Sequence, residues 1–141
     1  MPYDKLLQQG RIRHHAANPK EIRALLDLAN RDLSVAGSTL EVDPDWAYTI
    51  AYNAVLQASR ALMFSQGFRP RGSEGHATVV RFVREALGRE HVSKVNLFDQ
   101  MRRKRHRMLY EMAGLVGSQE AKNSLAFAKE FIDLIRRLIK I

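Results

Sequence analysis

Cysteine is absent from this chain of 141 residues, and long apolar runs are absent as well. Without cysteine, the protein forms no disulfide and no thiolate metal site. No apolar stretch approaches the roughly 20 residues that a membrane-spanning helix needs. The first ten residues, MPYDKLLQQG, contain no apolar core of a signal peptide. We therefore expect a cytoplasmic protein that does not enter a membrane.

Negative charge is also scarce, with 15 Asp and Glu residues against 23 Lys and Arg. The formal net charge of +8 favours an anionic partner, such as RNA, DNA, a nucleotide or an acidic protein. Hydrophobic residues make up 45% of the chain and charged residues 27%, which is typical of a folded globular domain. The length predicts one such domain.

Strand patterns, repeats and low-complexity tracts are missing, whereas helical periodicity covers most of the chain. Asn-Pro and Asp-Pro pairs give typical helix starts, and glycines give typical helix ends. The long helices are expected from Pro19 to Ala36, from Pro44 to Gln66, from between Ser93 and Asn96 to before Gly114, and onward from a cap at Ser118. A shorter helix is expected from about Glu74 to Leu87, and a short one around Leu6 and Leu7.

Short connections between these helices favour antiparallel neighbours. We predict an all-α protein, an antiparallel four-helix up-and-down bundle with an additional short helix and a short N-terminal helical segment. Residues 1–17 would form an N-terminal extension, and residues 18–141 the single bundle domain. The second long helix carries a stripe of small residues, which lets another helix approach closely. The stripe consists of Ala47, Ala51, Ala54, Ala58 and Ala61.

A cationic run, RRKRHRMLY at residues 102–110, falls within the third long helix. At the helical period, Arg105 lies on an inward seam that is otherwise apolar. The other members of this seam are Phe98, Met101, Met108 and Met112. A buried guanidinium without a partner costs several kcal/mol, so Arg105 needs an anion or an exit to water. It either pairs structurally, with Asp99, Glu111 or an acid of another helix, or lines an inward cationic groove.

The remaining residues of the run take two other faces of the helix. One set points outward, to solvent or to phosphates, and comprises Arg103, Lys104 and Arg107. The other set recurs every four residues along one edge beside the seam, and comprises Arg102, His106 and Tyr110.

Several stretches of the chain resemble the HEPN family, the higher eukaryotes and prokaryotes nucleotide-binding domain. They are NPKEIRALLDLANRDLSVA (18–36), AYTIAYNAVLQASRALMFSQGFRPRGSEGH (47–76), FDQMRRKRHRMLY (98–110) and KNSLAFAKEFIDLIRRLI (122–139). The likeness covers nearly the whole chain and depends on the order of the pieces. It implies a bundle of four main helices that usually pairs as a dimer. For many members it also implies metal-independent ribonuclease activity, with two motifs meeting in one basic cleft of the dimer.

The ribonuclease motif of that family is an arginine, four to six further residues and a histidine. Arg105 falls on the arginine, His106 on a following position that is often polar, and Tyr110 on the first position open to the histidine. If His106 were the motif histidine, an arginine would be needed within residues 99–101, where the sequence reads DQM. Arg102 is one residue too close. Histidine shuttles protons near neutral pH, whereas tyrosine, with an ordinary pKa of about 10, is a poor replacement.

The sequence resembles the family but has Tyr110 where the motif histidine is expected. We therefore expect a HEPN protein whose anion site persists while ribonuclease activity is weak or absent. It would be a homodimer without cofactor or metal. Its ligand would be an RNA or nucleotide phosphate, or an acidic partner such as a nucleotidyltransferase in a toxin–antitoxin-like system. The anion- or nucleic-acid-binding residues would be Arg102, Arg103, Lys104, Arg105, His106 and Tyr110.

Two alternatives stay open. The first is an active metal-independent endoribonuclease, toxin-like, with His106 and Arg102 or Arg105 as its catalytic residues. The second is a structural dimer in which Arg105 only makes interface pairs.

Four further residues are not expected to bind a metal or a ligand. His14 and His15 diverge by about 100 degrees on a helix and lack a carboxylate at the usual spacing, so no metal site is expected there. His76 follows a glycine-rich turn and is expected to cap or orient it. Trp46 is expected to anchor packing.

Overall fold

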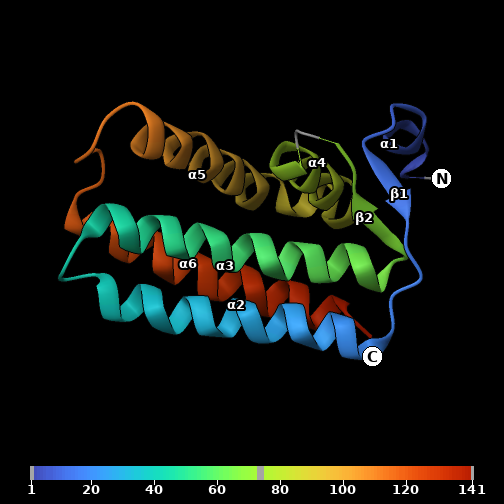
Figure 1. The fold of residues 1–141 in the computed structure, drawn as a ribbon, viewed down its shortest axis with the longest axis horizontal. Coiled ribbons are helices and arrows are strands. Elements are labelled where there is room, and N and C mark those ends of the chain that lie inside the picture. The colour runs from blue at the N-terminus through green and yellow to red at the C-terminus, as the bar shows by residue number, and fades with distance from the viewer. Residues whose placement is uncertain (1, 73–74, 141) are drawn as a thin grey trace.

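The fold of the chain is given by a computed structural model that describes residues 2–72 and 75–140 (Figure 1). Its helices are α1 (Asp4–Gln8), α2 (Pro19–Thr39), α3 (Pro44–Ser65), α4 (Gly75–Leu87), α5 (Val92–Tyr110) and α6 (Ser118–Leu138), with a 3-10 turn at Arg89–His91. Successive long helices run in opposite directions (Figure 1). The predicted all-α bundle with one extra helix and a short N-terminal helix is therefore confirmed. Among the described residues, no helix is both long and apolar enough to cross a bilayer.

The two predicted helix starts with proline have the expected caps. The Asn18 side chain accepts a hydrogen bond from the Glu21 amide at 2.9 Å, and the Glu21 carboxylate accepts one from the Asn18 amide at 3.3 Å. This reciprocal pair satisfies amides that the first turn of α2 leaves free. Asp43 caps α3 in a similar way, because its carboxylate accepts from the Trp46 amide at 3.2 Å.

Several helix ends differ from the prediction. Helix α2 continues through Gly37 to Thr39, where the Thr39 hydroxyl donates to the Val35 carbonyl at 2.7 Å and occupies an acceptor of the last turn. Helix α5 stops at Tyr110, four residues before the glycine that was expected to end it. The cap of α6 is Gly117 rather than Ser118. Glu74, the predicted start of α4, lies outside the described residues.

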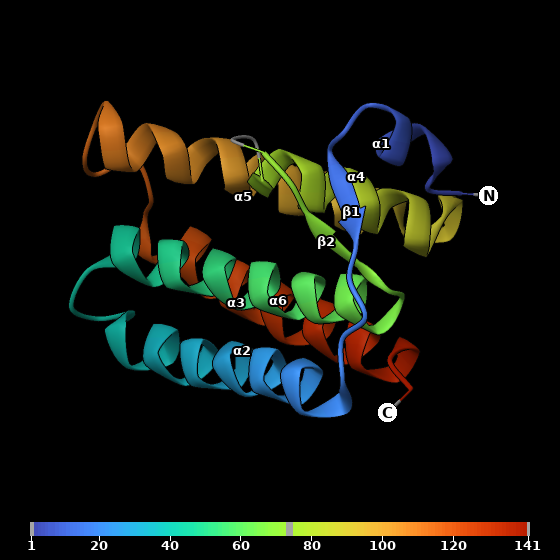
Figure 2. The same cartoon turned by 45° about the vertical axis from the view of Figure 1, so that its right-hand side comes forward.

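Two strands contradict the expectation that the chain has none. Strands β1 (Ile12–His14) and β2 (Phe68–Pro70) pair antiparallel and form a ribbon beside α4 (Figure 2). Three residues are too few for an alternating pattern to stand out in the sequence. The ribbon is held by aromatic packing: the Tyr3 ring stacks on Phe82 at 4.1 Å and meets the edge of Phe68 at 5.3 Å. The N-terminal segment therefore packs onto the bundle.

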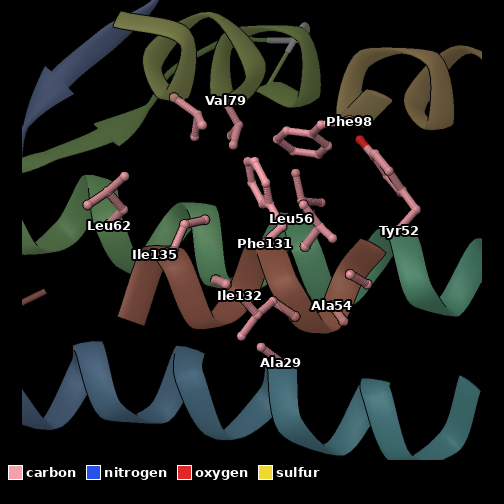
Figure 3. Close-up of a cluster of buried hydrophobic side chains, with 14 of the residues drawn as sticks. Ala29, Tyr52, Ala54, Leu56, Leu62, Val79, Phe98, Phe131, Ile132 and Ile135 are labelled. Atoms are coloured by element: carbon pink, nitrogen blue, oxygen red, sulfur yellow. The ribbon is translucent and has the colours of Figure 1, made fainter. Parts of the chain in front are cut away.

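Helix α3 is the centre of the core and contacts α2, α4, α5 and α6. Every alanine of its predicted stripe is buried, which allows the close approach of neighbouring helices. Figure 3 shows apolar side chains of α6, α4 and α5 meeting those of α3. Trp46 does not contribute as expected, because it lies in the first turn of α3 with 53% of its surface exposed.

Candidate functional site

Arg105 points inward, from α5 onto α3. Its guanidinium carbon lies 5.5 Å from the centroid of the Tyr52 ring, within range of a cation–π interaction. Its Nε is shielded from solvent, and within the described part of the chain it has no hydrogen-bond partner. A buried donor left unsatisfied costs about 1–3 kcal/mol, and more when it is charged. The helical period placed Arg105 correctly, but neither Asp99 nor another described acid pairs with it.

An open pocket of about 370 Å³ lies beside Arg105. We call it the Arg105 pocket. It is bounded by α3, the end of β2, the start of α4 and the middle of α5, and its polar lining consists of Asn53, Gln57, Arg60, His76 and Arg105. Two of these side chains are always cationic and one can become so, and none of the described lining residues is acidic. The pocket therefore suits an anion.

Tyr52 and His76 form a hydrogen-bonded pair at the edge of this pocket, with 3.0 Å between the Tyr52 hydroxyl and His76 Nδ1. Figure 3 shows Tyr52 reaching from α3 toward α4 and α5, with its oxygen at the far end. Burial raises the pKa of Tyr52, although the charges of Arg105 and Arg102 act against this rise. The hydroxyl stays protonated, and it either donates to Nδ1 of a ring that carries its proton on Nε2 or accepts from Nδ1–H of the other tautomer.

The electrostatic environment keeps His76 neutral. Burial lowers the pKa of His76 below its ordinary value of 6.5, and the charges of Arg105, Arg102 and Arg60 lower it further. An anion in the pocket offsets the part of this lowering that comes from the guanidinium charges, whereas the effect of burial remains. His76 is thus a neutral hydrogen-bond donor that becomes more basic when an anion binds.

Arg60 supplies the second permanent charge of the pocket. Its Nη1 donates to the Gln57 amide oxygen at 2.8 Å, which fixes the side chain along α3. Burial and the nearby charge of Arg69 lower the pKa of Arg60, but arginine remains charged at neutral pH. Two guanidinium groups that line one pocket, with no acid among its described lining residues, favour an anionic ligand.

Three cations of the run, one from the edge and two from the outward set, form structural pairs. Arg102 donates to the Asp99 carboxylate at 2.9 Å, and Arg103 donates to the same carboxylate. Burial opposes ionisation of Asp99, but these two hydrogen bonds prevail and lower its pKa. Lys104 bridges to Glu120 of α6 at 2.8 Å. These three cations are therefore partly neutralised.

His106 and Tyr110 lie on the surface, away from the Arg105 pocket. Their rings are 4.8 Å apart, as expected for residues four apart on a helix, and 71% of the Tyr110 surface is exposed. Within one chain, the structure brings Arg105 together with Arg60 and His76, and does not bring His106 or Tyr110 to them.

Sequence reasoning missed most of the pocket lining. Asn53, Gln57 and Arg60 follow at spacings of four and three, so they form a polar stripe on the otherwise apolar helix α3. This stripe was a usable signal, because polar residues on a buried helix need partners or a cavity. His76 gave no comparable signal, since only the packing of α4 against α3 brings it to Tyr52.

Comparison with known proteins agrees with this geometry. A family model described as the HEPN domain matches residues 22–138, from the first turn of α2 to the end of α6. No curated protein matches the chain. All residues that line the Arg105 pocket fall inside the matched segment. This match connects the chain with nucleotide- or RNA-related roles in general. Because the match covers most of its length, the chain belongs to the HEPN domain family.

Proposed function

We propose that the Arg105 pocket binds a phosphate group of RNA or of a nucleotide, and that the protein cleaves RNA weakly or not at all. The buried Nε of Arg105, which lacks a partner among the described residues, is the observation that carries this proposal. A phosphate oxygen supplies the missing acceptor, and Arg60 and His76 offer further donors around the same pocket. Family membership supports a nucleotide-related ligand.

The arrangement of protons argues for binding rather than cleavage. Metal-free cleavage of RNA needs a base for the 2′-hydroxyl, an acid for the leaving oxygen and a cation for the phosphorane. Arg105 and Arg60 meet the last requirement. In the tautomer in which the Tyr52 hydroxyl donates to Nδ1, His76 presents a proton rather than a lone pair to the pocket. In that tautomer, none of the described lining residues is a base ready to take the proton of the 2′-hydroxyl.

Nucleotide binding is tested with AMP by calorimetry and with a labelled RNA strand by fluorescence anisotropy, at fixed ionic strength. Loss of charge-assisted hydrogen bonds in Arg105→Ala is expected to weaken both affinities about tenfold or more. The matched control is Arg107→Ala, which removes the same charge from an exposed position of α5 and should change affinity less than about twofold. Equal binding by Arg105→Ala and the wild type would leave Arg105 only a structural role.

Cleavage is tested by incubating the protein with a mixed RNA pool in the presence of a chelator. The expected result is intact RNA. Cleavage that disappears in His106→Ala would favour the alternative, a ribonuclease that uses His106 with Arg102 or Arg105. Cleavage that disappears in His76→Gln instead would assign the proton transfer to the Arg105 pocket.

The proposal keeps a homodimer and a possible acidic protein partner. HEPN domains often form dimers, and a second copy would bring a second Arg105 pocket to the assembly. A nucleotidyltransferase of a toxin–antitoxin-like pair would present acidic groups to the same cationic surface. Its binding would then compete with AMP, whereas a partner that docks elsewhere would leave AMP affinity unchanged.

A further inference from the structure

One face of the β1–β2 ribbon carries only arginines. Arg13 lies directly opposite Arg69, and the Arg71 amide donates to the Arg11 carbonyl at 2.8 Å, which extends the pairing by one step. Alternate residues of a strand share a face, and opposed residues of an antiparallel pair point to the same side. The arginine face is therefore formed by Arg11, Arg13, Arg69 and Arg71. The opposite face packs inward through Ile12 and Phe68, both buried.

Like charges opposed across two strands destabilise the pairing unless an anion compensates them. Among the residues that the structure describes, no carboxylate forms an ion pair with Arg13, Arg69 or Arg71. Arg13 and Arg71 are exposed and Arg69 is half-buried, so their charges face solvent. Arg13 on β1, Arg69 on β2 and Arg71 next to it thus present positive charge that no described carboxylate compensates.

This arginine face continues into the Arg105 pocket. The guanidinium carbons of Arg60 and Arg69 lie 5.9 and 6.0 Å from the centroid of the same ring, that of Phe64. Arg60 lines the pocket, and Pro70 lines it from the opposite face of the ribbon, since it pairs with Ile12. Arg60 therefore stands between the pocket on one side and Arg69 of the ribbon on the other.

Aromatic rings lie beside Arg60 and Arg69, between the pocket and the ribbon. The His15 and Phe64 rings are 4.6 Å apart, and both are half-buried beside the two guanidinium groups. Planar guanidinium and aromatic groups stack on exposed nucleobases, which gives sequence-tolerant affinity for single strands. An acidic peptide uses the charges of such a surface but not its planar groups. A single strand bends easily enough to place one phosphate in the pocket and others along the ribbon, whereas a duplex is stiff over such short lengths.

We infer that the arginine face of the ribbon is a phosphate-binding track for single-stranded nucleic acid, and that the strand enters it from the Arg105 pocket. The inference rests on the proposed function, because the first phosphate of the strand occupies that pocket. It adds that the ligand is a polynucleotide strand that spans α5, α3 and the ribbon, rather than a lone nucleotide.

The test compares AMP with a labelled single strand of about 12 nucleotides. In the wild type, the strand should bind at least tenfold more tightly than AMP. The double variant Arg13→Ala/Arg69→Ala should lose most of this gain and leave AMP affinity unchanged. Each lost phosphate contact should also lower the slope of log affinity against log salt by about 0.7. Arg71→Ala, at an exposed residue after β2, should weaken strand binding in the same direction.

The matched control is Lys122→Ala/Lys129→Ala, which removes two charges from exposed positions of α6 and should change strand affinity less than about twofold. If the ribbon variants behave like this control, the track is wrong, while AMP binding that depends on Arg105 still upholds the proposed function. If neither ligand binds, both ideas fail. Tighter binding of a duplex, or equal binding of polyglutamate, would overturn the assignment to a single strand.

Discussion

Arg105 has two opposing effects on the stability of the folded chain. The Arg105 guanidinium gains a cation–π contact with Tyr52, yet its Nε stays without a partner among the described residues. A cation–π contact contributes about 0.5–2 kcal/mol, which is similar in size to the cost of one buried, unsatisfied donor. The net contribution of Arg105 to the folded state is therefore small, and its position is explained better by a ligand.

Arg105→Met is expected to separate these two effects. The substitution keeps the apolar stem and removes the buried charge, so the free energy of unfolding should stay the same or rise by about 1–2 kcal/mol. Affinity for AMP should fall at least tenfold. Urea unfolding and calorimetry measure the two quantities, with Arg107→Met as the exposed control. A loss of several kcal/mol in stability would show that Arg105 is structural.

The pKa of His76 makes stability depend on pH. Burial and the charges of Arg105, Arg102 and Arg60 lower this pKa below 6.5 in the folded chain. Between that lowered pKa and about 6.5, the unfolded chain binds more protons than the folded chain, so unfolding becomes easier as pH falls. The stabilisation from a neutral His76 is complete above about pH 6.5 and is lost below it.

Urea unfolding at a series of pH values tests this linkage. Between about pH 7.5 and 5.5 the wild type should lose more stability than His76→Gln, which cannot titrate and retains a polar side chain. Inorganic phosphate should reduce this loss, because an anion in the pocket favours protonated His76. Parallel curves for the two proteins would mean that His76 does not sense the guanidinium charges.

At the scale of elements, two glycines have opposite roles. Gly37 lies within α2, and a Cβ added there would meet Leu125 Cδ2 of α6 at 3.8 Å, an ordinary contact distance. Gly88 follows α4 with φ of 73° and ψ of −171°, a conformation that is essentially reserved for glycine. The first glycine is therefore replaceable, and the second is required by the backbone.

The same substitution should change stability in opposite directions at these two positions. Gly37→Ala should raise the free energy of unfolding by roughly 0.5–1 kcal/mol, because alanine restricts the unfolded chain and favours the helix. Gly88→Ala should lower it by roughly 1–3 kcal/mol through backbone strain. Urea denaturation of both variants measures the effects. If Gly37→Ala is destabilised instead, the added methyl group does not fit beside Leu125, although its distance of 3.8 Å is that of an ordinary contact.

The helices, including the short α1, were predictable from the sequence, and the two short strands were not. The caps Asn18 and Asp43 identified the starts of α2 and α3 because a side chain there satisfies free amides of the next turn. The ribbon was not predicted, because its strands pair residues that are far apart in sequence, such as Arg13 and Arg69. Three-residue strands are stabilised by packing on the bundle rather than by local propensity.

At the scale of the whole molecule, Arg105 is the one described lining residue of the pocket that the sequence identified as a site residue. The helical period located Arg105, since one turn of a regular helix fixes direction relative to the core. Arg60 comes from α3 and His76 from α4, and their meeting with Arg105 depends on how these helices pack. Ion pairs such as Arg102 with Asp99 also partly neutralise the cationic run. Fewer of its charges are therefore available to a ligand than the sequence suggested.

Exposed apolar side chains gather where the bundle turns at one end. The Asp45 carboxylate, in the first turn of α3, accepts a hydrogen bond from the Val116 amide at 3.1 Å and ties the α5–α6 connection to α3. The end of α5 and the α2–α3 connection therefore lie at the same end of the bundle, on either side of the start of α3 (Figure 1). Four side chains of these segments are largely exposed: Val42 (83%), Trp46 (53%), Tyr110 (71%) and Met112 (58%). Such a group suits an interface between two copies.

We expect the protein to form a homodimer through this end. Light scattering should give a mass near twice 16.1 kDa. The single tryptophan, Trp46, should shift its emission to shorter wavelength as concentration rises, because dimer formation buries its indole. Met112→Lys should shift the equilibrium toward monomer, since a charge in an apolar interface is costly. Leu138→Lys, an exposed apolar position at the C-terminal end of α6, is the matched control and should leave the dimer intact. A doubled mass with unchanged Trp46 emission would move the interface elsewhere, and a mass that stays at that of one chain would refute the dimer.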